Sequence, residues 1–178
     1  MHAGLGPAVS APDPAPAPPL ARRLACFVYE GVLLFGVLMV AGFIYATATQ
    51  QRHALQGTHG LQAFLFVVLG LYFVTFWSRT GQTLAMQTWQ IRLLTRDGQR
   101  VSALRAGCRY LAAWMWFAPA LLALWLAGIH TPWASFTTLL AGVLGYAALA
   151  RLHPDRQYWH DALCGTRLVL SPKNRPRP

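Results

Sequence analysis

The feature that most constrains the fold of this chain is a long apolar run that contains a single acid. The run extends from Arg22 to Ala48, opens with two arginines and carries Glu30 in its first half. An apolar helix crosses the hydrocarbon core of a bilayer in about 20 residues, and an ionisable side chain inside it costs a few kcal/mol or more unless another group compensates. The run therefore predicts a membrane helix in which another group must compensate the cost of burying Glu30.

The composition of the whole chain also favours a membrane protein. Of its 178 residues, 55% are hydrophobic and only 11% are charged, whereas soluble domains carry about 25% charged residues. The net charge is +10, but the arginines separate apolar runs instead of clustering on one polar face, which argues against a nucleic-acid partner. Three cysteines without framework or zinc-site spacing are expected to be reduced thiols: Cys26, Cys108 and Cys164.

Four apolar segments predict four transmembrane helices, at about residues 24–46, 61–77, 110–127 and 132–150. The third segment contains Pro119, which a membrane helix tolerates. The short connection between the third and fourth segments predicts an antiparallel hairpin. Small residues recur along the fourth segment at helical spacing and predict close helix packing: Ala134, Thr138, Ala141, Gly145 and Ala148. The predicted fold class is therefore an all-α membrane protein with four transmembrane helices.

Around this domain, which we place at residues 21–171, the sequence predicts two tails. Residues 1–20 are rich in proline and alanine and predict disorder, and residues 172–178 form a basic tail. Most basic residues precede the first segment, lie in the loop 78–109 or follow the fourth segment, so the positive-inside rule predicts that both termini are cytoplasmic. The small residues Ala46–Ala48 leave a cleaved signal peptide as an alternative.

The loop 78–109 carries signals of local structure. Gly81–Gln90 mixes apolar and polar residues and predicts an interfacial helix, for which Thr83 is a candidate first residue. Ile91–Leu94 reads as a short strand, and Arg167–Leu170 near the end of the chain reads as another. We expect these two strands to pair, because a lone strand would leave its backbone without hydrogen-bond partners. Ser102 predicts the N-cap of the helix that follows.

Three segments, taken in order, resemble the RDD family of membrane proteins, which is named for one arginine and two aspartates. They run from Arg23 to Glu30, from Gly81 to Leu93 and from His160 to Arg167. The first aspartate of the family pattern falls on Glu30, which keeps the charge on a longer side chain. Where many members carry a lysine, this chain has Met86. The resemblance implies these family-motif positions: Arg23, Glu30, Gln82, Thr83, Asp161 and Arg167.

The resemblance implies an architecture more specifically than it implies an activity. It implies a multi-pass protein of the bacterial cytoplasmic (inner) membrane. Transport of unidentified ligands has been suggested for the family, and some members are linked to sodium/proton exchange. No nucleophile–base pair, phosphate loop or paired-carboxylate site is visible in the sequence, so we expect the protein not to be an enzyme. We also expect no cofactor and no metal site, although His160 and Cys164 lie four residues apart.

Each candidate residue has a structural and a functional interpretation. Glu30 is either a proton- or cation-binding carboxylate or a hydrogen-bonded lock between helices. Arg23 is either a topology anchor or a group that binds a ligand. Asp161 either caps a short helix or pairs with an arginine, for which Arg23, Arg92 and Arg167 are the candidates. Gln82 and Thr83 are expected to bond polar groups of the loop.

Two hypotheses for function remain open at this stage. In the first, the protein takes part in transport of ions or small solutes, with Glu30 as the coupling group; four short helices would then require a homo-oligomer. In the second, it is a non-transporting module of the lipid bilayer that assembles with or regulates a membrane partner through the small residues of the fourth segment.

Overall fold

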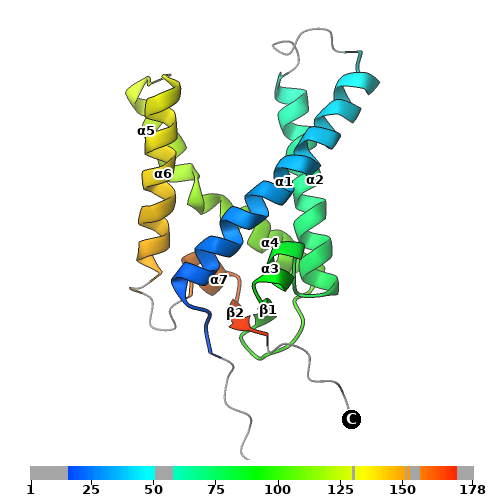
Figure 1. Cartoon of the computed structure of the whole chain (residues 1–178), viewed down its shortest axis with the longest axis vertical. Coiled ribbons are helices and arrows are strands. Elements are labelled where there is room, and N and C mark those ends of the chain that lie inside the picture. Colours follow the sequence, from blue (N-terminus) through cyan, green and yellow to red (C-terminus); the bar gives the residue numbers. More distant parts are fainter. Residues whose placement is uncertain (1–15, 51–57, 130, 151, 153–156, 172–178) are drawn as a thin grey trace, which may run out of the picture.

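The computed structural model describes residues 16–50, 58–129, 131–150, 152 and 157–171. Of the predicted tails, residues 1–15 and 172–178 lie outside the described residues. Residues 16–20 are described and belong to the folded part, since Pro18 is buried and Leu20 begins the first helix. Figure 1 shows two helical arms that rise from a common base, and the described parts near both chain ends lie at this base. A hydrogen bond from the Leu170 amide to the Pro16 carbonyl (3.2 Å) joins the two ends of the described chain.

The first arm consists of the long helices α1 (Leu20–Ala48) and α2 (Thr58–Arg79). Both are long and apolar enough to cross a membrane, as the sequence predicts. Large apolar side chains along α1 are exposed, among them Val32, Phe35 and Phe43. In a soluble protein such side chains would face water, whereas in a bilayer they face lipid of the same polarity. The chain is therefore a membrane protein.

The third predicted helix is bent and not straight. It consists of α4 (Ala103–Ala113), the 3₁₀ turn η1 (Trp114–Trp116) and α5 (Ala118–Ala127), with an angle of 43° at the break. Pro119 lies in the first turn of α5. Because proline has no N–H and clashes with the preceding turn, a helix usually restarts at such a position. The described residues thus offer three membrane-spanning helices, or four if the bent pair forms one span.

The second arm is a hairpin of α5 and α6 (Pro132–Leu149), as the sequence predicts. Gly128 ends α5 in the left-handed conformation (φ 61°), which suits glycine. The two helices come close at Gly142, where a Cβ atom would lie 2.8 Å from the Cβ of Ala120. Gly142 is not part of the predicted small-residue stripe. Of that stripe, Ala134 and Thr138 are half-buried, whereas Ala141, Gly145 and Ala148 are exposed.

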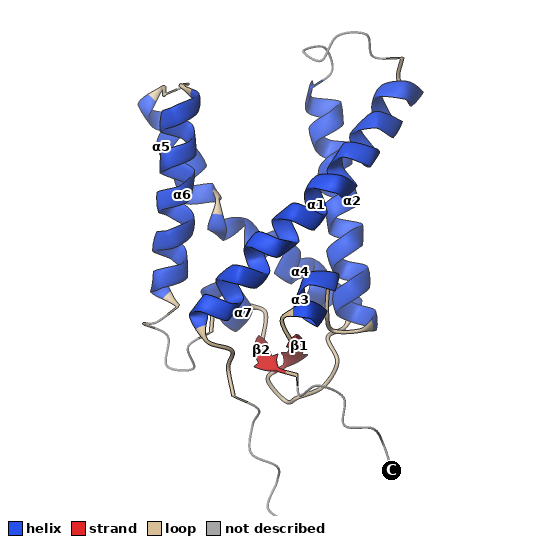
Figure 2. Ribbon diagram, viewed as in Figure 1, coloured by secondary structure: helices blue, strands red, loops and turns tan. Residues whose placement is uncertain are grey.

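The base of the molecule is a compact cap of two strands and two short helices, and Figure 2 shows the strands in red below the helices. The cap consists of α3 (Leu84–Thr88), β1 (Ile91–Thr95), α7 (Trp159–Leu163) and β2 (Thr166–Leu170). The predicted strand pairing is confirmed: β1 and β2 are antiparallel, with Leu93 opposite Leu168. The helix signals are confirmed as well, since Thr83 caps α3 and Ser102 caps α4.

Candidate functional site

Glu30 lies on α1 and is only 8% exposed. One carboxylate oxygen accepts a hydrogen bond from the Tyr72 hydroxyl (2.7 Å), and the other accepts one from the Thr83 hydroxyl. Both donors are neutral. Within the described residues, the ion pairs involve Asp161 and not Glu30. Glu30 is therefore a buried carboxylate that hydroxyl groups solvate and that no side-chain cation neutralises in the described part of the chain.

Local sequence signals and helix packing together place the two donors. Thr83 is the N-cap of α3 and accepts a hydrogen bond from the Met86 amide (3.3 Å). Because α3 packs against α1, the same hydroxyl can donate its proton to Glu30. Tyr72 projects from α2, which also contacts α1. The carboxylate thus links α1, α2 and α3, which agrees with the interpretation of Glu30 as a lock between helices. Its negative charge can still be compensated by a proton or a bound cation.

Asp161 has a different environment. It is fully buried and forms an ion pair with Arg109 of α4, with 2.7 Å between Oδ1 and Nε. The Arg109 guanidinium also lies over the Trp77 ring, 4.2 Å from its centroid. The sequence suggested Arg23, Arg92 or Arg167 as the partner, and that suggestion is wrong. The predicted third span begins only at residue 110, just after Arg109. The amphipathic helix α4 begins at Ala103, after its predicted N-cap at Ser102, and turns this arginine inward.

His160 lies beside Asp161 in a stack of aromatic rings. Its main-chain N–H donates to the Tyr146 hydroxyl (3.1 Å), and that hydroxyl lies 2.9 Å from Nδ1 of the imidazole. The hydroxyl and Nδ1 share a hydrogen bond whose direction depends on the imidazole tautomer, and Nε2 lies 3.6 Å from Oδ1 of Asp161. Burial lowers the pKa of His160 to about 4, so the ring is neutral at pH 7.

Arg23 and Tyr158 lie together where α1 enters the cap. The Arg23 guanidinium stands over the Tyr158 ring, 4.8 Å from its centroid, a cation–π geometry. Arg23 is 6% exposed, so it is part of the interior and not only a surface anchor. Burial raises the pKa of Tyr158 to about 12, and its hydroxyl therefore keeps its proton.

The other predicted family-motif positions, Gln82 and Arg167, contact or belong to the strands of the cap. Gln82 donates from Nε2 to the Ile91 carbonyl of β1 (2.7 Å), as expected for a residue that bonds polar groups of the loop. Arg167 lies in β2 opposite Leu94. Among the described residues, no group of three or more His, Cys, Asp or Glu side chains could hold a metal ion.

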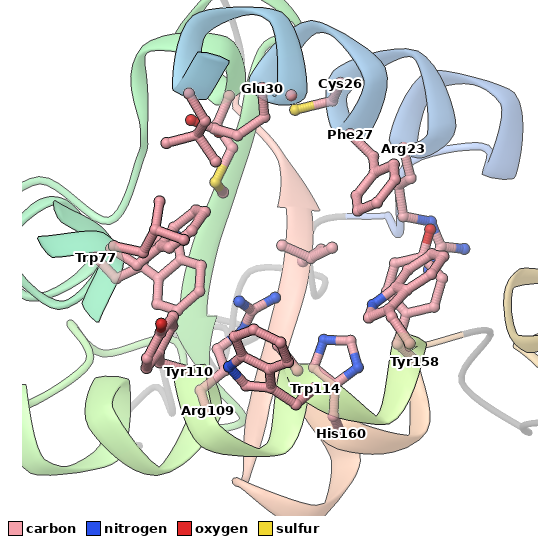
Figure 3. A pocket seen from close by; sticks show the side chains of 18 of the residues that line it. Arg23, Cys26, Phe27, Glu30, Trp77, Arg109, Tyr110, Trp114, Tyr158 and His160 are labelled. Atoms are coloured by element: carbon pink, nitrogen blue, oxygen red, sulfur yellow. The ribbon is translucent and has the colours of Figure 1, made fainter. Parts of the chain in front are cut away.

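One cavity connects most of these residues. It has a volume of about 460 Å³ and is bounded by α1, α2, α4, η1 and the cap. Figure 3 shows Glu30 and Cys26 along one wall, Arg23 and Tyr158 at one side, Trp77 at the other, and Arg109 directed inward between them. Phe27 of α1 stacks on Trp116 of η1, with 4.9 Å between the ring centroids. The carboxylate and both arginines thus face a common space.

The RDD family matches residues 17–165 of the chain. The chain belongs to the RDD family. No curated protein and no solved structure matches it.

The match to the RDD family covers α1 to α7 and therefore nearly all of the cavity wall. Several residues at the site were not anticipated: Tyr72, Trp77, Arg109, Tyr146 and Tyr158. Only Arg109 carried a usable signal, because α4 has a strongly amphipathic sequence that identifies its inner face. The aromatic residues carried none, since a tyrosine in an apolar segment is typical of any membrane helix.

Proposed function

We propose that this RDD family protein takes part in the transport of ions or small solutes across the membrane, and that it is not an enzyme. In this proposal Glu30 is the group that binds and releases a proton or a cation. The observation that carries it is the environment of Glu30: a carboxylate that is 8% exposed, borders a cavity and has two neutral hydrogen-bond donors.

The charge of Glu30 needs compensation that the fold does not supply as an ion pair within the described residues. A buried carboxylate is stable only when it is paired, protonated or bound to an ion. Asp161 is paired with Arg109, so its charge is fixed in place. The hydroxyl groups of Tyr72 and Thr83 can donate to the charged form of Glu30 and can accept from its protonated form. This donor set therefore supports both protonation states, as a coupling group requires.

We infer that the cap faces the cytoplasm and that the protein lies in a bacterial inner membrane. The described arginines support this orientation, because all of them lie at the cap end of the helices: Arg22, Arg23, Arg79, Arg92, Arg96, Arg100, Arg105, Arg109 and Arg167. Basic residues favour the cytoplasmic side of membrane proteins.

Flux in liposomes tests the proposal. The purified protein, reconstituted in liposomes with a trapped pH-sensitive dye, should dissipate a sodium or potassium gradient with proton movement. Glu30→Gln should abolish this flux, and Glu30→Asp should retain part of it. Asp97→Asn is the matched control, because it makes the same acid-to-amide change at an exposed residue. Equal flux in the wild type and Glu30→Gln would overturn the role of Glu30.

A second candidate function has one observation in its favour. Ala141, Gly145 and Ala148 form a small-residue stripe on α6 that is exposed in the single chain, and such stripes allow another helix to approach closely. A module that assembles with a second copy or a membrane partner would use this face. Absence of flux, together with a disulfide cross-link between two Gly145→Cys chains in the membrane, would favour this alternative.

A further inference from the structure

Among the described residues that border the cavity, Glu30 is the only acid. Its two hydrogen-bond donors, Tyr72 and Thr83, are neutral, and the ion pairs of the described chain do not include it. A carboxylate on the wall of a cavity attracts a positive charge into that cavity. The Glu30 end of the cavity therefore favours a cationic ligand.

The two arginines on the cavity wall leave this preference in place. Arg109 already has a counter-charge, because it is paired with Asp161 at 2.7 Å. Arg23 lies at the cap end of α1, and about 10 Å of helix rise separates it from Glu30. Because the interaction of two charges weakens with distance, a ligand cation in contact with Glu30 is attracted more strongly than Arg23 repels it.

Aromatic rings form much of the remaining wall. Figure 3 shows Trp77 and Tyr110 on one side of the space and Phe27 and Tyr158 on the other. Trp77 and Tyr158 each already lie under a guanidinium group of the protein, which is 4.2 Å and 4.8 Å, respectively, from the ring centroid. The faces of aromatic rings attract cations, and the rings also provide apolar contact area. This wall therefore suits a cation that carries apolar substituents.

The size of the cavity favours an organic cation over an inorganic one. Its volume of about 460 Å³ lies within the usual range of small-molecule sites. A metal ion would fill a small part of this space and would need several oxygen ligands, whereas an organic cation fills it and contacts the rings directly. Phe27 and Trp114 border the cavity and are 36% and 38% exposed, so the space is accessible from outside the single chain.

We propose that the cavity binds a hydrophobic monovalent organic cation, such as a quaternary ammonium or phosphonium, with its charge beside Glu30 and its apolar substituents against the aromatic rings. Leu34, Leu38 and Leu69 border the same space and extend the apolar contact surface for these substituents. This inference rests on the proposed transport function, because it names the class of cation that Glu30 binds and releases.

Equilibrium binding of tetraphenylphosphonium tests the inference without measuring flux. With the full chain in phosphatidylcholine nanodiscs, we expect saturable binding of the radiolabelled cation after the signal of empty nanodiscs is subtracted. Unlabelled benzyltriphenylphosphonium should displace the probe. Triphenylphosphine oxide, a neutral molecule that also carries phenyl groups on phosphorus, should displace it far less. Equal displacement by the neutral molecule would overturn the inference, because it would show that the cavity selects no charge, and so would binding that does not saturate.

The variant Glu30→Gln tests the position of the ligand charge. It should lower the affinity for tetraphenylphosphonium roughly tenfold or more, because it removes the charge that attracts the ligand. Asp97→Asn makes the same acid-to-amide change at an exposed residue and should leave the affinity unchanged. The melting temperature of the empty protein shows whether each variant is folded. Unchanged affinity in Glu30→Gln would overturn the inference.

The variant Trp114→Leu tests the aromatic wall independently of Glu30. Trp114 borders the cavity and is partly exposed, so leucine keeps an apolar side chain there and removes only the ring. The affinity for tetraphenylphosphonium should fall roughly threefold, the effect of one cation–π contact at a partly exposed site. Trp133→Leu is the matched control, because Trp133 is an exposed tryptophan of α6 that is not among the residues that border the cavity. Equal affinity in Trp114→Leu and Trp133→Leu would contradict the proposed contact with the rings.

Binding and flux together separate this inference from the proposed transport function. Flux of sodium or potassium in liposomes without saturable binding of tetraphenylphosphonium would overturn only the organic-cation site. Saturable binding that Glu30→Gln weakens, without flux of sodium, potassium or tetraphenylphosphonium, would overturn only the transport function.

Discussion

Two buried carboxylates in the described part of the chain, Asp161 and Glu30, are held in opposite ways. Asp161 lies in the cap with a cation at 2.7 Å, and its charge is neutralised by the fold itself. Glu30 lies in the membrane-spanning helix α1, and its partners are the hydroxyl groups of Tyr72 and Thr83. A fixed ion pair ties a charge to one structure, whereas hydroxyl groups stabilise both a charged and a neutral carboxyl group. The first arrangement suits a structural role, and the second suits a site that exchanges an ion.

The largest expected effect concerns the ion pair. Asp161→Asn should lower the free energy of unfolding by about 3–5 kcal/mol, because the Arg109 charge would stay buried without its partner. Chemical denaturation of the purified protein in detergent micelles measures this loss. The double variant Arg109→Met/Asp161→Asn should be more stable than Asp161→Asn alone, since it removes both charges. If the stability losses of Arg109→Met and Asp161→Asn simply added in the double variant, the ion pair would not be the source of the effect.

The second prediction uses pH to examine the same part of the cap. Since burial lowers the pKa of His160 to about 4, the unfolded chain binds a proton between about pH 6.5 and pH 4 that the folded chain does not bind. Stability should therefore fall as the pH is lowered through this window, by at most about 1.4 kcal/mol per pH unit. His160→Gln should make denaturation midpoints less dependent on pH. Parallel pH curves for the variant and the wild type would exclude this role.

A smaller effect is expected from one donor to Glu30. Tyr72→Phe removes the hydroxyl that donates to the carboxylate at 2.7 Å and should cost about 1.5 kcal/mol, a value in the range for hydrogen bonds to charged groups. The melting temperature in detergent reports this change. Tyr29→Phe, which alters an exposed tyrosine on the same arm, should have no measurable effect. A loss comparable to that of Asp161→Asn would show that the hydroxyl is a major structural link.

The smallest loss of stability is expected for Glu30→Gln. The glutamine carbonyl can accept from one hydroxyl and its amide can donate to the other, so we expect less than about 1 kcal/mol. The same denaturation assay compares this variant with Asp161→Asn. Similar losses in the two variants would remove the distinction between the carboxylates and would make Glu30 a structural lock.

Much of the architecture was predictable because its causes are local. Apolar segments long enough to cross a bilayer identify helices by themselves, and the positions of α1, α2 and α6 agree with the prediction to within a few residues. The pairing of β1 with β2 was predictable as well, since two short strands each need a partner. The caps at Thr83 and Ser102 follow from residue type and position alone.

The chemistry of the site was less predictable, because its partners come from distant parts of the chain. Nothing near Asp161 in the sequence identifies Arg109, and nothing near Glu30 identifies Tyr72, since both contacts depend on how each helix is rotated about its axis. The bend before α5 had a visible cause in Pro119, but its angle depends on how η1 packs.

The sequence by itself determined that this chain spans a membrane, that an acid lies inside its first helix and that the chain resembles the RDD family. Hydrophobicity and motif order decide these points without reference to packing. Only the tertiary structure decided which carboxylate has a fixed cation, which has hydroxyl donors and where a cavity lies between them. The physical reason is that the charge state of a buried group depends on the atoms that surround it, and those atoms meet only when the helices pack.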